Sequence, residues 1–148
     1  MLDEVKAAFQ GELHGLTEKI IGVFFSVLNE LGTGFVELIY QRAICIALVE
    51  AGFQVAQEMP IDVWFHGQKI GVFKADVVVN GKVLLELKVG ETMDRQYEAQ
   101  LLHYLRATDI EVGMVLVFGT RGRFRRLTLL NETKKGNYNS NGNGLNGD

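Results

Sequence analysis

The chain has 148 residues, a formal net charge of −3, a hydrophobic fraction of 47% and a charged fraction of 22%, values typical of one folded domain with its own core. The acidic balance argues against strong, general binding to nucleic acid through charge alone, because that binding depends on a basic surface. No apolar stretch is long enough to span a bilayer, and we expect no signal peptide because acidic and basic residues interrupt the first ten positions. The single cysteine, Cys45, cannot form an internal disulfide, so we expect a cytoplasmic protein.

The first third of the chain predicts three helices. One covers about residues 2–14, and a second runs over 17–31 with Thr17 as its N-cap, because apolar residues there recur at three- and four-residue spacing. Glycines then break the chain. A third helix is predicted over 35–51 and ends at Gly52, a residue suited to the left-handed C′ position.

The remainder alternates in the manner of strands, with one further helix. The predicted strands cover 53–58, 61–65, 70–79, 83–89, 112–118 and 123–130, with Pro60 as an interruption and a helix over 93–107. The helix is a crossover, so the strands on either side of it should be parallel neighbours. We therefore predict an α/β fold, a mixed β-sheet flanked by helices, in one domain over 1–132. The Asn- and Gly-rich segment 133–148 is predicted to be a disordered tail.

Polar residues stand out on two of the predicted strands. Glu86 and Lys88 lie two apart on one strand and so share a face, and Asp76 lies on the preceding strand. Carboxylates from adjacent strands suit a hard divalent cation such as Mg²⁺, with Mn²⁺ as a substitute. A neighbouring lysine can orient a metal-bound water for attack on a phosphodiester.

The turn between these strands provides a geometric test. Asn80-Gly81 is a strong hairpin signal. If these two residues alone formed the loop, Asp76 and Glu86 would point to opposite faces of the sheet. A shared site therefore requires an odd-length loop or a bulge between the two carboxylates, and we predict one.

These residues also match known motifs. Asp76 followed by Glu86-Leu87-Lys88 resembles the Asp…Glu-x-Lys signature of the PD-(D/E)XK nuclease superfamily, with Ala75 in place of the proline. The segment from Gly34 to Tyr40 resembles the motif of the GxxExxY proteins, with Glu37 at its acidic position. Gln100 to Tyr104 resembles the Gln-x-x-x-Tyr helix motif of RecB-like exonucleases. The matches follow the family order over roughly residues 16–130.

The resemblance implies a restriction-endonuclease-like fold and a Mg²⁺-dependent nuclease that hydrolyses phosphodiester bonds in nucleic acid, with DNA favoured over RNA. It implies that Asp76 and Glu86 are the principal metal ligands and that Glu37 approaches from its helix as a ligand or as support. Lys88 is expected to hold the attacking water and to stabilise developing charge. Supporting contacts are expected from Tyr40, Gln100 and Tyr104.

A second hypothesis belongs to a different class of protein. The small size and acidic balance also suit a catalytically silent module that keeps the nuclease fold and binds nucleic acid or a protein partner. Basic residues do cluster at Arg121, Arg123, Arg125 and Arg126, with Lys134 and Lys135 beyond. They fit a nucleic-acid contact or a solvated edge strand protected from aggregation. A homodimer formed through that edge is a further hypothesis.

Overall fold

The computed structural model describes residues 2–134. The elements are α1 (Leu2–Leu31), α2 (Glu37–Glu50), β1 (Val55–Phe65), β2 (Gln68–Val79), β3 (Val83–Val89), α3 (Arg95–Arg106), β4 (Val112–Phe118), β5 (Arg123–Thr128) and the 3-10 helix η1 (Asn131–Thr133). The predicted α/β class with a mixed sheet is confirmed. Thr133 and Lys134, which we assigned to the tail, are part of the described structure, and 135–148 lie outside the described residues.

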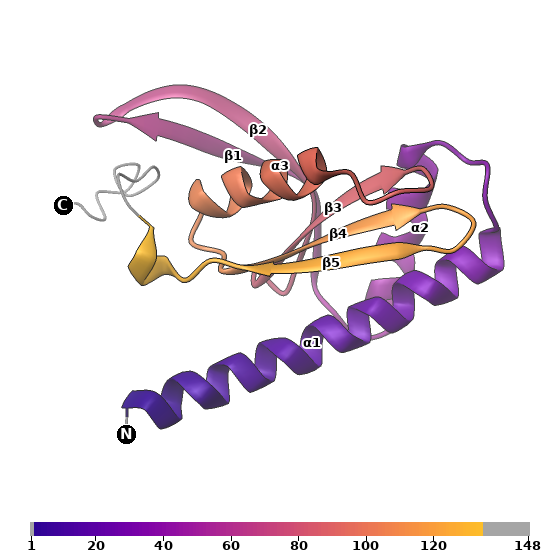
Figure 1. The fold of residues 1–148 in the computed structure, drawn as a ribbon, viewed down its shortest axis with the longest axis horizontal. Helices are drawn as coiled ribbons and strands as arrows, with labels where there is room; N and C mark the ends of the chain where they lie inside the picture. Colours follow the sequence, from indigo (N-terminus) through magenta and orange to yellow (C-terminus); the bar gives the residue numbers. More distant parts are fainter. Residues whose placement is uncertain (1, 135–148) are drawn as a thin grey trace.

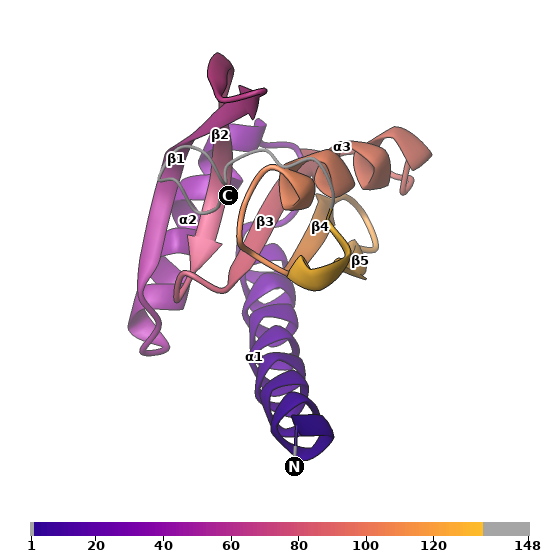
Figure 2. The same cartoon turned by 90° about the vertical axis from the view of Figure 1, so that its left-hand side faces the viewer.

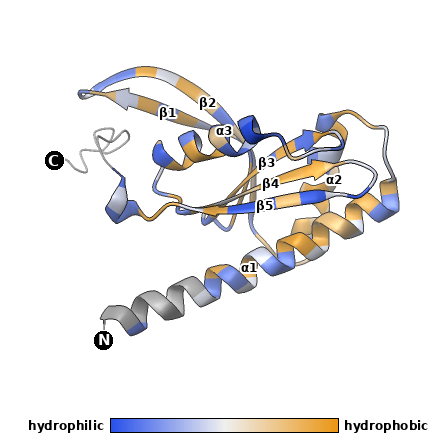
Figure 3. Ribbon diagram, in the orientation of Figure 1, coloured by the Kyte–Doolittle hydropathy of each residue, from blue (hydrophilic) through white to orange (hydrophobic). Residues whose placement is uncertain are grey.

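One five-stranded sheet, in the order β1-β2-β3-β4-β5, forms the middle layer. Strands β3 and β4 are parallel, as predicted from the crossover helix α3, and the other neighbours are antiparallel. Helices α1 and α2 cover one face and α3 the other (Figures 1 and 2). Strand β4 is buried and hydrophobic along its whole length, whereas the edge strand β5 is mostly hydrophilic (Figure 3).

The prediction of two helices before residue 31 was wrong, because α1 is continuous. Thr17 is not an N-cap: its hydroxyl donates to the His14 carbonyl at 2.9 Å and accepts from Arg126 at 2.6 Å. A threonine within a helix can bond back to its own backbone in this way. Threonine often begins a helix, but Thr17 lies inside α1 and connects the helix to β5.

The predicted interruption at Pro60 was also wrong. Strand β1 runs through Pro60, which lies opposite Lys74 of β2. The strand is at the edge of the sheet, and an edge position tolerates a residue without a backbone N–H. One long strand therefore replaces the two short ones that we expected.

The β1–β2 hairpin is twisted about its middle. On β1, the even-numbered residue Ala56 packs against the α3 side of the sheet. After Glu58 the odd-numbered residues Met59 and Ile61 pack on that side instead. On β2 the same change falls between Ala75 and Val78. The φ angle of Glu58 is +53°, a strained conformation that costs about 1–3 kcal/mol in a residue other than glycine. The outer part of the hairpin thereby leaves the sheet and leans over α3 (Figure 1).

The carboxyl ends of β3 and β4 approach each other closely. A Cβ atom built on Gly119 would lie 1.9 Å from the backbone oxygen of Gly90, two residues after Lys88. We predict that Gly119→Ala lowers the free energy of unfolding by about 1–3 kcal/mol through backbone displacement, as measured by urea denaturation. Gly71→Ala is the control, since nothing lies within 4 Å of its Cβ position. Equal stability of the two variants would contradict this close approach.

Candidate functional site

The β2–β3 loop brings Asp76 and Glu86 to the same level. Val79 pairs with Val83, so residues 80–82 form a three-residue loop. The predicted odd-length loop is therefore confirmed. Continuing this register by the next pair beyond Val77 and Leu85 places Asp76 opposite Glu86.

The pairing of β2 with β3 ends at this level. The last backbone pair is Val77 with Leu85, and beyond it the Asp76 side chain takes the place of the ladder. Its Oδ2 accepts a hydrogen bond from the Leu87 backbone N–H at 2.8 Å. A buried N–H needs such a partner, so Asp76 is held at the point where the two strands separate.

Glu86 is nearly enclosed, with an exposed fraction of 4%. Its Oε2 lies 3.7 Å from Lys88 Nζ, and its Oε1 is the buried side-chain oxygen without a hydrogen-bond partner among the described residues. Burial, followed by the negative charge of Asp76, raises the pKa of Glu86 to about 8, although Lys88 opposes this. A buried ionised oxygen without a partner is costly, so the carboxyl group holds its proton at neutral pH in the metal-free protein.

Lys88 lies beside Glu86 and against α3. Its side chain is 22% exposed, and its Nζ lies 5.3 Å from the centroid of the Tyr97 ring. A cation over an aromatic face is held electrostatically. The ammonium group is therefore next to the acidic pair and in contact with solvent.

Glu37 reaches the same group of charges from the first turn of α2. Partial burial raises its pKa, Lys88 lowers it and Asp76 raises it. Tyr40 fixes this end of the helix: its ring stacks on Phe118 at 4.3 Å and its hydroxyl donates to the Gly32 carbonyl at 2.6 Å. Tyr40 is thus a fully buried residue that anchors the turn preceding Glu37.

The predicted pair Gln100 and Tyr104 lies on α3, which covers the face of the sheet opposite to α2. Gln100 Nε2 donates to the Tyr104 hydroxyl at 2.7 Å, and the Tyr104 ring stacks on Phe73 of β2 at 4.0 Å. Burial raises the pKa of Tyr104, and the charges of Glu86 and Asp76 raise it further. Charge interactions or contacts therefore link six of the seven predicted residues. Tyr40 contacts Gly32 and Phe118 and is connected to the other six only through the start of α2.

The structure adds two residues that our reading of the sequence missed. Gln41 of α2 has an exposed fraction of 6%, and its Nε2 donates to Glu58 Oε2 at 3.1 Å. The charge of Glu58 in turn raises the pKa of Asp76. The four-residue spacing from Glu37 to Gln41 was a weak signal that both share a helix face, but nothing in the strand pattern marked Glu58.

These residues suit a divalent cation for two reasons. They offer carboxylate oxygens, which hard cations prefer, and Glu86 has a buried oxygen without a hydrogen-bond partner in the described structure. They do not form a complete cage. Within residues 2–134, no three His, Cys, Asp or Glu side chains are close enough together to hold a metal ion. Water and substrate oxygens would have to supply the remaining ligands, as is common for Mg²⁺.

The basic cluster is largely engaged within the protein. Arg123 Nε donates to the Glu91 carbonyl at 2.9 Å, and Arg125 lies 3.8 Å from the Glu98 carboxylate. Lys134 is buried and donates to two backbone carbonyls of the α3–β4 connection, so it does not belong to a basic surface. Of the two interpretations of the basic cluster, these contacts favour the solvated edge strand over the nucleic-acid contact.

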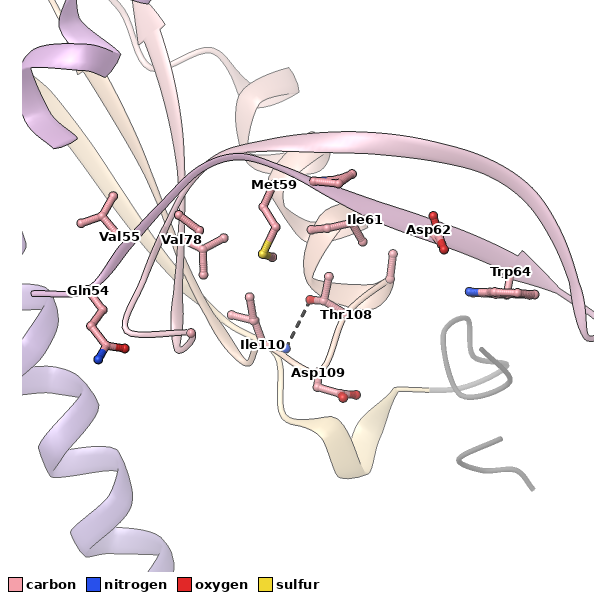
Figure 4. Close-up of a pocket in the computed structure, with 14 residues that line it drawn as sticks. Gln54, Val55, Met59, Ile61, Asp62, Trp64, Val78, Thr108, Asp109 and Ile110 are labelled. Carbon is pink, nitrogen blue, oxygen red and sulfur yellow. Dashed lines mark hydrogen bonds between the residues drawn. The ribbon is translucent and has the colours of Figure 1, made fainter. Parts of the chain in front are cut away.

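A pocket of about 740 Å³ opens beneath the β1–β2 hairpin, between β1 and the α3–β4 connection (Figure 4). Apolar side chains line much of it, among them Met59, Ile61 and Ile110. None of the carboxylates of the candidate site belongs to its lining. The candidate site is therefore distinct from this pocket and lies where β2 separates from β3.

An acidic pair and a lysine, placed where two strands of a mixed sheet separate, define a nuclease-like α/β domain. A family model described as the PD-(D/E)XK nuclease superfamily matches residues 14–127, a range that includes every residue of the site. The chain belongs to this superfamily, whose members typically use divalent metals. The comparisons with curated proteins and with solved structures found no match. In the described part of the chain, no helix is long and apolar enough to cross a membrane.

The raised pKa of Glu86 predicts a pH dependence of stability. Between its ordinary pKa of 4.5 and about 8, the folded chain binds more protons than the unfolded chain, so stability falls as the pH rises. We predict this fall for the metal-free protein between pH 5 and 7.5, with a slope of up to about 1.4 kcal/mol per pH unit from this one group. Glu86→Gln should flatten it, as measured by urea denaturation in the presence of a chelator. Identical slopes for the two proteins would contradict a protonated Glu86.

Proposed function

We propose that this protein is a metal-dependent nuclease that hydrolyses phosphodiester bonds in nucleic acid. One observation carries the proposal: Glu86 keeps a buried carboxylate oxygen without a partner in the described structure, beside Asp76 and Lys88. A protein that needed only the fold could replace such a group by an apolar residue without loss of stability. Membership of the superfamily supports the same conclusion.

We assign the cation, Mg²⁺ with Mn²⁺ as a substitute, to Asp76 and Glu86, with Glu37 as a third ligand or as support through water. When bound, the cation lowers the pKa of a water molecule and neutralises phosphate charge. In this proposal Lys88 would hold the attacking water and donate to the phosphate oxygen on which charge develops. Glu86 must release its proton for the site to act, which favours activity at mildly alkaline pH.

The remaining predicted residues orient this set. Tyr40 holds the start of α2, and the Gln100–Tyr104 pair faces the carboxylates from α3. We place the chain in the GxxExxY group, on the residues from Gly34 to Tyr40. DNA as the favoured substrate and a cytoplasmic location are part of the same proposal.

A catalytically silent module is the second candidate. The carboxylates do not assemble three ligands around one point in the described part of the chain. The arginines of β5 are engaged within the protein. Such a module would keep the fold and bind nucleic acid or a protein partner without cleavage. A homodimer through the edge strand β5 would pair two sites and so suit the nuclease.

The test combines metal binding and cleavage on the same samples. We predict that wild-type protein binds Mn²⁺ in calorimetric titrations and that Asp76→Asn lowers the affinity at least about tenfold, because it removes a ligand charge. Lys88→Met should keep most of the metal affinity and lower the cleavage rate about 100-fold, since it removes a group that acts on water and phosphate. Glu50→Gln, an exposed acid at the end of α2, is the matched control.

The outcomes separate the two candidates. Metal-dependent cleavage that is lost in Asp76→Asn and Lys88→Met supports the nuclease. Metal binding without cleavage of single- or double-stranded DNA or RNA favours the silent module. If neither the wild type nor any variant binds Mn²⁺ in the presence of nucleic acid, the metal-dependent proposal is rejected.

A further inference from the structure

Three carboxylates lie at one level of three neighbouring strands. Asp76 on β2 faces Glu86 on β3 in the continued β2–β3 register. On its other side, the pairs that flank it in the β1–β2 ladder, Gln57 with Val77 and Met59 with Ala75, leave Glu58 opposite Asp76. Asp76 is therefore the middle member of an acidic row.

Both ladders are interrupted at this row. Glu58 and Asp76 are absent from the paired residues although the register is unchanged on either side of them, and β3 pairs with β2 only below the row. The backbone of Glu58 is left-handed at this position. The carboxylate of Glu58 is therefore placed by a local distortion of β1 and not by the regular alternation of the strand.

The distortion is coupled to α2 through a buried amide. Gln41, one helical turn after Glu37, donates to Glu58 Oε2 at 3.1 Å. The same helix thus carries one predicted ligand of the site and the group that fixes Glu58. The bond occupies one of the two carboxylate oxygens of Glu58 and holds the group on the Asp76 side of the hairpin, where the charges of Glu58 and Asp76 interact.

We propose that Glu58 is a fourth carboxylate of the cation site and that Gln41 is its positioning residue. Glu58 acts through a metal-bound water, because no three His, Cys, Asp or Glu side chains among the described residues are close enough together to hold an ion directly. One observation points to a cation at this row: Glu86 presents a buried oxygen without a hydrogen-bond partner within the described residues. The inference rests on the proposed metal-dependent function, and it adds a residue outside the motifs from which that function was read.

The test is calorimetric titration of Mn²⁺ into wild-type protein, Glu58→Gln and Glu50→Gln. Glu58→Gln keeps the shape of the side chain and an oxygen that accepts the Gln41 bond, but it removes the negative charge. We expect it to lower the Mn²⁺ affinity about tenfold, whereas Glu50→Gln removes the same charge from the far end of α2 and leaves the affinity unchanged. Glu58→Asp should recover part of the loss, because the carboxylate is restored.

Two further measurements distinguish a residue of the cation site from a structural residue. The stability of the metal-free protein, measured by urea denaturation, should be similar in wild type and Glu58→Gln, since the Gln41 bond persists. The titrations are repeated at 0.5 M KCl, where a long-range effect of one exposed charge is screened. The effect of a carboxylate that holds a metal-bound water persists there, and a loss of affinity that disappears at high salt would overturn the proposal. Should Glu58→Gln not fold, Glu58→Asn is compared with Glu58→Asp, which has the same length and keeps the charge, and asparagine tolerates the left-handed conformation.

The result also separates this inference from the proposed function. If Asp76→Asn loses Mn²⁺ and Glu58→Gln binds it as well as Glu50→Gln does, Glu58 is not part of the site and the nuclease proposal stands. If wild-type protein binds no Mn²⁺, even in the presence of nucleic acid, both are rejected. A tenfold loss in Glu58→Gln, at both salt concentrations and with unchanged stability, supports the fourth carboxylate.

Discussion

The hydrogen bond from the Leu87 backbone N–H to the Asp76 carboxylate marks the constraint on which the site depends. It lies just beyond Val77 and Leu85, the last backbone pair of β2 and β3. It replaces the ladder bond that is lost as the strands separate. The sheet can open here because a side chain satisfies the freed N–H. The outer half of the β1–β2 hairpin then leans over α3, and Glu86 is left with one buried oxygen that has no hydrogen-bond partner in the described structure.

Electrostatics follow from this geometry. Among the described residues, Glu37, Asp76 and Glu86 surround a single lysine, Lys88, and burial raises the pKa of each carboxyl group. Without a cation, the protein lowers the repulsion by keeping a proton on Glu86. A divalent cation would exchange that proton for metal coordination, so metal binding and proton release are coupled. The strain at Glu58 lies beside this group, as is common for strained residues near functional sites.

Much of the fold could be predicted from residue patterns. Buried β4, the crossover α3 and the odd-length loop followed from local periodicity, chain connectivity and the need for Asp76 and Glu86 to share a face. The continuous α1 and the strand through Pro60 could not be predicted in this way. A hydroxyl that bonds back to its own helix and an edge position that tolerates proline depend on tertiary neighbours.

The residues of the candidate site were also only partly predictable from the sequence. Asp76, Glu86 and Lys88 stand in a recognisable spacing, and the structure brings them together with Glu37 from α2. Glu58 could not be identified, because an acid in an exposed strand has the same pattern whether it serves a site or only solvent. Its left-handed backbone and its bond to Gln41 exist only in three dimensions.

The most direct test of the central claim is a crystal structure of the protein grown with Mn²⁺, with anomalous diffraction data collected to locate the metal. The account predicts an anomalous density peak within about 2.0–2.4 Å of carboxylate oxygens from both Asp76 and Glu86. It also predicts that the oxygen of Glu86 that lacks a partner, Oε1, becomes a ligand. Full-occupancy Mn²⁺ elsewhere, with these two carboxylates unchanged, would contradict it.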